Sequence, residues 1–129
     1  MTELAMAFDY GTKRIGVAVG QKITGTATPV AVVKARDGVP DWQVIARLIE
    51  EWKPTVFVVG LPINMDGTES DMSVAATRFS RRLNGRYGIR IELMDERLST
   101  FEAREFEATD QLDAIAAKLI LETWLAAST

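Results

Sequence analysis

AMAFDYGTKRIGVAVG, residues 5–20, joins two apolar runs through a polar turn that contains Gly11 and Thr12. Two apolar runs separated by a tight turn predict a β-hairpin. The first run ends abruptly on Asp9, and burying a carboxylate at the end of an apolar strand is costly unless a partner stabilises it. Two interpretations stay open: Asp9 caps the turn with its own side chain, or a cation binds to it.

The pattern after the hairpin predicts a further antiparallel strand and then alternating helices and strands. Residues 26–33 are rich in β-branched side chains, and Pro29 within them indicates an edge or bulge position. Apolar residues take the helical period over 40–53, whereas the continuous apolar run at 55–60 is typical of a strand buried on both faces. The other expected elements are a polar loop over 34–39, a loop over 61–67, a helix over 68–88, a strand over 89–94, a short helix over 99–107 and a helix over 110–127.

Local signals indicate where the helices begin and end and which sides they bury. Thr68 with Asp71 three residues later predicts the start of the second helix, and Gly88 predicts its end. Ser99 with Glu102 forms a capping-box pattern that would open the short helix. The positions expected to face the sheet are Met72, Ala76, Phe79 and Leu83 in the second helix, and Leu112, Ile115, Ala116, Leu119, Ile120 and Trp124 in the last.

The order of these elements places antiparallel pairing first and parallel βα units afterwards. We therefore expect a single α/β domain over residues 1–129, with a mixed five-stranded sheet of three antiparallel strands followed by parallel ones, and helices on both faces. This is the element order of the ribonuclease H-like fold.

Composition limits the chemistry of which the protein is capable. The chain has neither histidine nor cysteine, which excludes an imidazole base, histidine-bound zinc, thiolate metal sites and disulfides. Acid–base or metal chemistry would fall to Asp, Glu, Lys, Tyr or water, and carboxylate oxygens favour Mg²⁺ or Mn²⁺. The net charge of −3 restricts binding of a polyanion to a local basic patch. No apolar run is long enough to span a membrane and no signal peptide is visible, so we expect a cytoplasmic protein.

Three acidic residues are expected to converge at one edge of the sheet. Asp9 ends the first strand, Glu96 ends the last strand, and Asp113 lies in the first turn of the last helix. Carboxyl ends of parallel strands share the edge where open α/β sheets bind ligands. Because divalent cations relieve the repulsion between clustered acids, the trio is a candidate catalytic metal site. Alternatives exist: Asp113 would suit the positive end of its helix, and Glu96 would pair with Arg14 or Arg97.

Several basic side chains and one loop are candidates for contact with a nucleic acid. Residues 60–67 follow the buried strand at the same edge, where Asn64 or backbone N–H groups would bind a phosphate or simply form a turn. Arg78, Arg82 and Arg86 recur every four residues along one side of the second helix, as a phosphate-binding surface or an ordinary solvated face. The full candidate set is Lys13, Arg14, Asn64, Arg78, Arg82, Arg86 and Arg97.

Four segments resemble the YqgF/RuvX family, whose members are described as Holliday junction resolvases and as pre-16S rRNA nucleases. They are residues 8–18, residues 60–67, residues 95–100 and, more weakly, Asp113 with the apolar residues up to Leu121. The resemblance implies a ribonuclease H-like fold in which Asp9, Glu96 and Asp113 hold Mg²⁺ or Mn²⁺ as the catalytic acids. It implies a nuclease acting on precursor rRNA or, alternatively, on branched DNA. Symmetric junction cleavage would favour a homodimer, whereas RNA trimming needs only a monomer.

The chain departs from the family at one place. Residues 105–112 alone separate Arg104 from Asp113, where family members carry a longer loop with glycine and lysine. The third acid is therefore open between Asp113 and Asp110, and a non-catalytic RNA-binding module of the same fold is a competing hypothesis. A second competitor is an ATP-binding protein of the actin, sugar-kinase and Hsp70 type, because the first hairpin resembles its phosphate-binding hairpin. That class needs two such domains and a far longer chain.

Overall fold

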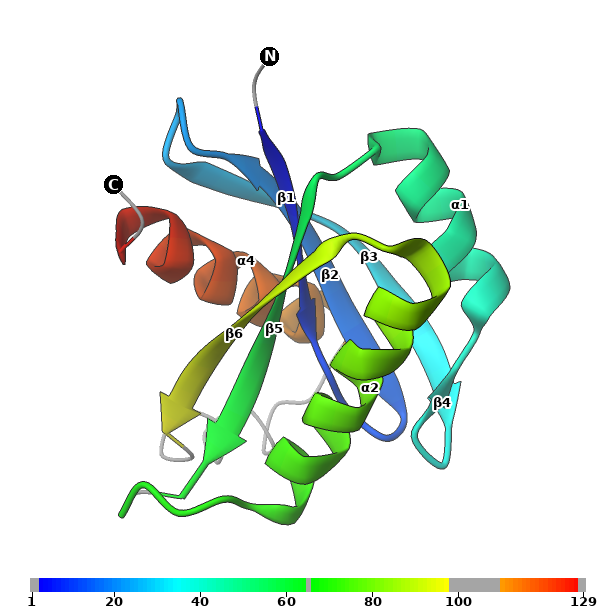
Figure 1. Ribbon diagram of the computed structural model, residues 1–129, viewed down its shortest axis with the longest axis vertical. Helices are drawn as coiled ribbons and strands as arrows, with labels where there is room; N and C mark the ends of the chain where they lie inside the picture. Colours follow the sequence, from blue (N-terminus) through cyan, green and yellow to red (C-terminus); the bar gives the residue numbers. More distant parts are fainter. Residues whose placement is uncertain (1–2, 65, 98–109, 128–129) are drawn as a thin grey trace.

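The hairpin over residues 5–20 forms the centre of the sheet in the computed structural model, which describes residues 3–64, 66–97 and 110–127 (Figure 1). β1 (Leu4–Asp9) pairs antiparallel with β2 (Arg14–Gln21) and parallel with β5 (Val56–Ile63). The order across the sheet is β4-β3-β2-β1-β5-β6. The other elements are β3 (Thr26–Arg36), β4 (Val39–Pro40), α1 (Trp42–Trp52), α2 (Asp71–Tyr87), β6 (Arg90–Arg97) and α4 (Asp110–Ala127). The predicted mixed α/β sheet is confirmed.

The predicted number of five strands is wrong, because residues 34–39 form a hairpin rather than a loop and the sheet has six strands. β3 continues to Arg36, and Ala35 lies opposite Pro40 of β4. Asp37 and Gly38 make the turn with φ angles of 51° and 83°. Left-handed conformations at both central residues are typical of an Asp-Gly hairpin turn. The signal was therefore present in the sequence as the dipeptide Asp37-Gly38.

Pro29 lies at a β-bulge, as its position predicted. The register between β2 and β3 shifts so that Val17 is opposite Ala31 while Ala18 is opposite Pro29. A bulge tolerates a residue that has no backbone N–H to donate to the ladder.

The two faces of the sheet carry separate apolar cores, one under α1 and α2 and the other under α4 (Figure 1). Phe8 of β1 packs in the first core against Phe79 of α2, with ring centroids 5.5 Å apart. Ala7, the preceding residue, packs in the second core with Leu121 of α4. Successive residues of a strand alternate between faces, so β1 contributes to both cores.

α2 begins later than predicted. Ser70 is its N-cap and forms a capping box with Ser73, whereas Thr68 donates from its backbone N–H and its hydroxyl to Asp66. Gly88 ends the helix with a φ angle of 66°, as predicted. The expected face is confirmed: Ala76, Phe79 and Leu83 are buried, and Met72 packs partly buried against them.

β5 and β6 each extend past the predicted ends of the strands. Leu61 pairs with Asp95, and Pro62 pairs with Glu96, so residues 61–63 are strand rather than loop, and β6 continues through residues 95–97. A proline is tolerated here in a strand that still forms its ladder with one neighbour. The predicted short helix over 99–107 lies outside the described residues.

α4 has the predicted bounds but buries a different side. Ile120 and Trp124 are buried as expected, whereas Leu119 is 52% exposed. The helix is apolar on most of its sides, so periodicity does not select the buried one. In the structure, the buried side is the one on which Ala114 lies against Gly16 and Leu121 against Gly20. Its buried residues are Ala114, Ala117, Ile120, Leu121, Trp124 and Leu125. Neither α4 nor any other helix in the described part of the chain has the length and hydropathy of a membrane span.

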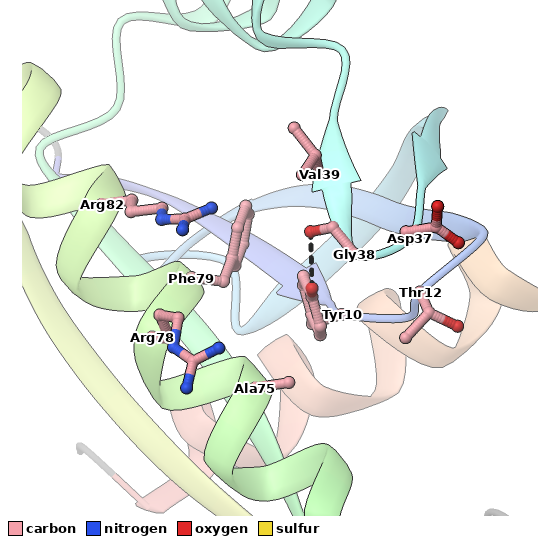
Figure 2. A pocket seen from close by; sticks show the side chains of 9 residues that line it. All are labelled: Tyr10, Thr12, Asp37, Gly38, Val39, Ala75, Arg78, Phe79 and Arg82. Carbon is pink, nitrogen blue, oxygen red and sulfur yellow. Dashed lines mark hydrogen bonds between the residues drawn. The ribbon is translucent and has the colours of Figure 1, made fainter.

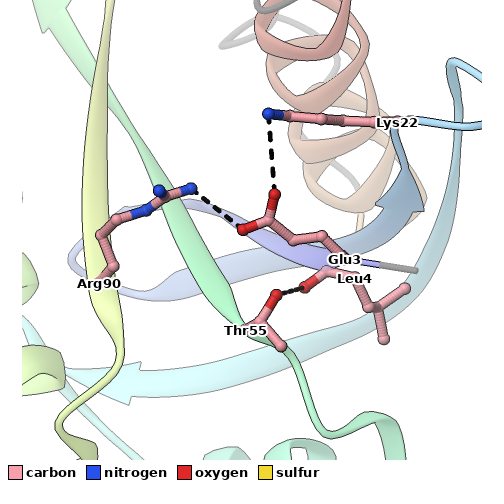
Figure 3. A network of polar contacts seen from close by, with 5 residues as sticks. All are labelled: Glu3, Leu4, Lys22, Thr55 and Arg90. Carbon is pink, nitrogen blue, oxygen red and sulfur yellow. Dashed lines mark hydrogen bonds and ion pairs between the residues drawn. The ribbon is translucent and has the colours of Figure 1, made fainter. Parts of the chain in front are cut away.

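A polar network joins the amino-terminal ends of β1, β5 and β6 to the carboxyl-terminal end of β2, at the end of the sheet opposite Asp9 (Figure 3). Glu3 pairs with Arg90 of β6 at 3.1 Å and with Lys22, just after β2, at 3.7 Å. Thr55 donates from its backbone N–H to the carbonyl oxygen of Leu4 at 2.8 Å. Exposed ion pairs contribute little stability, so this network adds little to the stability of the sheet.

Candidate active site

Asp9 is the last residue of β1 and is only 6% exposed. It follows Phe8, which packs under α2, and lies two residues after Ala7, which packs under α4. Alternation along the strand therefore places Asp9 on the face that α4 covers. Every buried side-chain nitrogen or oxygen among the described residues has a hydrogen-bond partner, so the burial of this carboxylate is compensated.

The first turns of α4 reach the neighbourhood of Asp9 through Gly16. Gly16 lies opposite Asp9 in the register of β1 and β2. A Cβ atom built on Gly16 would lie 1.8 Å from the backbone carbonyl oxygen of Asp113. Only a residue without a side chain permits so close an approach of helix to strand. The structure therefore places the backbone of Asp113 against Gly16, the residue that pairs with Asp9.

Arg14 forms an ion pair with Asp113. Its Nε donates to Oδ2 of Asp113 at 2.6 Å, and the two side chains are 34% and 14% exposed. Hydrogen bonds between charged groups are short and strong. The sequence placed Arg14 among contacts to a nucleic acid, but the structure gives it a partner inside the candidate site. The reason is topological: Arg14 begins β2, the strand on which α4 packs.

Glu96 comes to the same edge of the sheet at the end of β6. β1, β5 and β6 run parallel, and Glu96 pairs with Pro62 near the carboxyl end of β5. The side chains of Glu96, Arg97 and Asp110 lie outside what the structure describes. No three acidic side chains gather within the part of the chain that is described. The three-acid cluster, and the choice of Asp113 over Asp110, therefore stay predictions.

The other predicted nucleic-acid contacts differ in their surroundings. Lys13 is exposed in the hairpin turn, and Arg78 and Arg82 are exposed on α2. Arg86 lies over the ring of Trp42, with its guanidinium carbon 4.0 Å from the ring centroid. The three arginines of α2 are therefore not equivalent, although they share one side of the helix.

Asn64 is engaged within its own loop. Its side-chain amide donates to the hydroxyl of Thr68 at 3.0 Å and to the carbonyl oxygen of Glu69 at 3.3 Å. These bonds shape the connection between β5 and α2, which agrees with the turn interpretation of this loop.

The sequence did not predict a pocket that lies beside the hairpin turn on the face away from α4 (Figure 2). It has a volume of about 170 Å³. Tyr10 lines it and donates its hydroxyl to the carbonyl oxygen of Gly38 at 2.6 Å. Burial raises the pKa of Tyr10, and the nearby charges of Arg82 and Arg78 partly lower it. The lining residues are Tyr10, Thr12, Asp37, Gly38, Val39, Ala75, Arg78, Phe79 and Arg82.

The profile of a family described as "RuvX: Holliday junction resolvase" matches residues 3–127. The chain belongs to this family. It is 52% identical to a protein of Azotobacter vinelandii over 95% of this chain and 93% of the relative. It is 53% identical to one of Pectobacterium carotovorum subsp. carotovorum over 95% of this chain and 94% of the relative. Both relatives are named "Putative pre-16S rRNA nuclease", and these findings confirm the predicted enzyme class, a nuclease.

Solved structures with the same fold support the ribonuclease H-like architecture. T. thermophilus RuvC in complex with a Holliday junction substrate superposes with a TM-score of 0.58 at 12% identity, covering 98% of this chain and 95% of that chain. The fowlpox virus Holliday junction resolvase gives a TM-score of 0.52 at 14% identity, covering 96% and 99%. At such low identity the likeness shows the fold alone, and it confirms the predicted fold class.

Proposed function

We propose that this RuvX-family chain is a single-domain, divalent-metal-dependent nuclease that hydrolyses phosphodiester bonds of precursor 16S rRNA. The observation that carries the proposal is the contact of the Asp113 backbone with Gly16, opposite Asp9. This contact places the backbone of Asp113 beside the strand position opposite Asp9, and both acids have low exposure. It lies at the carboxyl end of β1, where open α/β sheets bind ligands. Glu96, the third acid of the proposal, ends β6 at the same edge.

Mg²⁺ or Mn²⁺ fits these residues because all the proposed donor atoms are carboxylate oxygens. Asp9, Asp113 and Glu96 would hold the cation. Met94 packs toward α4, and residues two apart in a strand share a face, which is the reason for proposing Glu96 rather than Asp95. A bound cation would stabilise the charge on the scissile phosphate and supply a water acidic enough to attack at neutral pH.

Arg14 has a positioning role in this proposal. Its bond to Oδ2 of Asp113 fixes the orientation of that carboxylate and offsets one negative charge beside Asp9. The proposed contacts to the substrate backbone are Lys13, Asn64, Arg78, Arg82, Arg86 and Arg97.

Precursor rRNA is the favoured substrate because the relatives that bear its name are 52% and 53% identical over nearly their full length. The solved resolvases are only 12% and 14% identical. One chain supplies all three proposed acids, so cutting a single RNA strand needs no second copy. Symmetric cutting of a Holliday junction, the second candidate function that the family description names, would require a homodimer. Processing of precursor rRNA would place the protein in the cytoplasm.

Asp9→Asn tests the proposed activity directly. The substitution keeps the shape of the side chain and removes a charge that holds the cation, so it should abolish cleavage while the fold is retained. The measurement is the cleavage rate of precursor 16S rRNA and of a four-way DNA junction, side by side, in Mg²⁺, in Mn²⁺ and in EDTA. Asp41→Asn is the matched control, because Asp41 is an exposed N-cap and asparagine caps helices equally well.

The proposal requires cation-dependent cleavage by the wild type and by Asp41→Asn, with none by Asp9→Asn. Cleavage in EDTA, or at the wild-type rate by Asp9→Asn, would reject the metal-dependent mechanism. Cleavage of the junction but not of the RNA would transfer the proposal to the resolvase function. Binding of the RNA without cleavage under any of these conditions would favour the non-catalytic module.

A further inference from the structure

The pocket between the hairpin turn and α2 presents two arginine side chains to one small space (Figure 2). Arg78 and Arg82 are one turn apart on α2 and line the pocket from one side. In the described part of the chain neither arginine forms an ion pair. Both of their charges act on the Tyr10 hydroxyl at the opposite wall. The two guanidinium groups are therefore free to bind an anion together.

The opposite wall of the pocket is held in place by three hydrogen bonds between two turns. Gly38 donates from its backbone N–H to Thr12 at 3.0 Å, and Ala35 donates to Lys13 at 2.9 Å. Tyr10 donates its hydroxyl to Gly38. A Cβ atom at Gly38 would lie 2.7 Å from that hydroxyl, and the φ angle is +83°, so glycine is required there. The pocket is thus formed before any ligand binds, which lowers the cost of binding.

Size and charge restrict what the pocket accepts. Its volume of about 170 Å³ is below the roughly 300–1,000 Å³ of pockets that enclose a whole drug-sized ligand. Asp37 lies on the far side from the two arginines (Figure 2), so two positive charges face the space where an anion would sit. Arginine pairs phosphate oxygens with several donors at once. These features fit one phosphate group and not a whole nucleotide.

We propose that the pocket is a subsite for a single backbone phosphate of the substrate strand, near the phosphodiester that is cut. This inference rests on the proposed function. Asp9 and Tyr10 are adjacent in the chain, so the hairpin turn has the acids on its α4 side and the pocket on its α2 side. A strand that crosses the turn meets both. A phosphate bound by Arg78 and Arg82 would determine which phosphodiester bond of the strand lies at the proposed catalytic acids.

The test measures binding in EDTA with the intact chain, so that its outcome is independent of whether cleavage occurs. One arm titrates inorganic phosphate and follows the amide resonances of Gly38 and Thr12. The other arm uses non-cleavable 2′-O-methyl oligonucleotides, each with one neutral methylphosphonate at a different position. The variant is Arg78→Gln with Arg82→Gln, and the control is Arg81→Gln, an exposed arginine of α2 that does not line the pocket.

A phosphate subsite predicts saturable shifts of Gly38 and Thr12 in the wild type and in Arg81→Gln, and their loss in the double variant. One methylphosphonate position should weaken wild-type binding about tenfold, the usual scale for losing a charged hydrogen bond, without weakening the double variant further. Equal phosphate shifts in the double variant would overturn the proposal. Shifts with free phosphate but no sensitive oligonucleotide position would also overturn it, since the pocket would then serve a free anion. These binding measurements remain informative even if the protein does not cleave RNA, because none of them depends on cleavage.

Discussion

A few residues around Asp9 determine the chemistry of the candidate active site at the carboxyl end of β1. Asp9 and Asp113 were predictable as candidates, because each is an acid at the boundary of an apolar segment. The pairing of Arg14 with Asp113 was not, since 99 positions of sequence separate them and only the packing of α4 on β2 brings them together. Tyr10 was also missed, although it directly follows Asp9. Its role depends on Gly38, whose turn the pattern had indicated only as a polar loop.

Tyr10→Phe should lower the free energy of unfolding by about 1 kcal/mol at neutral pH, because the variant cannot donate the hydrogen bond to Gly38. The difference in unfolding free energy between the wild type and Tyr10→Phe should then narrow as the pH rises above about 10, where an unfolded tyrosine ionises. Burial raises the pKa of Tyr10 in the folded protein. As the pH rises, the unfolded wild type therefore releases its proton before the folded form does. This ionisation favours unfolding of the wild type, whereas the phenylalanine variant has no such group.

Urea unfolding of both proteins, at neutral pH and at about pH 11, measures this difference. Tyr87→Phe is the control, because the Tyr87 ring packs at the edge of Phe57 and its hydroxyl forms no hydrogen bond with the described residues. A difference between wild type and Tyr10→Phe that stays constant or grows with pH would contradict the assigned role of the hydroxyl.

α4 completes the candidate active site, because it carries Asp113 to the end of β1 at which Asp9 lies. Its bounds were predictable from its apolar composition, but its buried side was not, because apolar residues surround most of it. The deciding contact is the close approach of the Asp113 backbone to Gly16 of β2. Glycines within a strand indicate close approach of another backbone, so this signal was present in the sequence, but nothing in it named α4 as the partner.

Gly16→Ala should displace the first turns of α4, since the added Cβ would lie 1.8 Å from the Asp113 carbonyl oxygen. Overpacking of this kind costs about 1–3 kcal/mol of unfolding free energy. A misplacement of about 1 Å at a catalytic group costs about a hundredfold in rate. The measurements are the melting temperature and the cleavage rate of precursor rRNA.

Gly85→Ala is the matched control for Gly16→Ala. Gly85 lies within α2, and a Cβ atom there meets nothing within 4 Å. Alanine should stabilise that helix by about 0.5–1 kcal/mol and leave cleavage unchanged. A Gly16→Ala variant with the melting temperature and cleavage rate of the wild type would contradict this prediction. It would show that neither stability nor cleavage depends on the close packing of α4 against Gly16.

The whole molecule carries a net charge of −3, so a nucleic acid would have to bind at a local basic patch. The mixed sheet was predictable because the order of apolar segments determines which strands pair antiparallel and which parallel. The sixth strand was missed because β4 has only two residues, too few to show a period. The basic residues gathered along α2 were visible as a helix face, whereas the pocket between α2 and the hairpin turn depends on tertiary packing.

Neutralising Arg78, Arg82 and Arg86 should weaken binding of precursor rRNA and make it less dependent on salt. For every phosphate that the variant no longer binds, the slope of log K against log salt should flatten by roughly one unit. Fluorescence anisotropy over a salt series in EDTA measures the slope. Arg47→Gln on α1 is the control, because Arg47 is exposed and lies on a different helix. An unchanged slope in the triple variant would return these arginines to an ordinary solvated helix face.

The central claim, that Asp9 and Asp113 form one cation site across Gly16, is tested most directly with Mn²⁺ as a paramagnetic probe. Substoichiometric Mn²⁺ should broaden the amide resonances of Asp9, Gly16 and Asp113 first, and leave those of Glu3, at the other end of β1, sharp. Asp9→Asn should abolish the selective broadening, whereas Asp41→Asn should not. Broadening centred on other acids, or unchanged in Asp9→Asn, would contradict the claim.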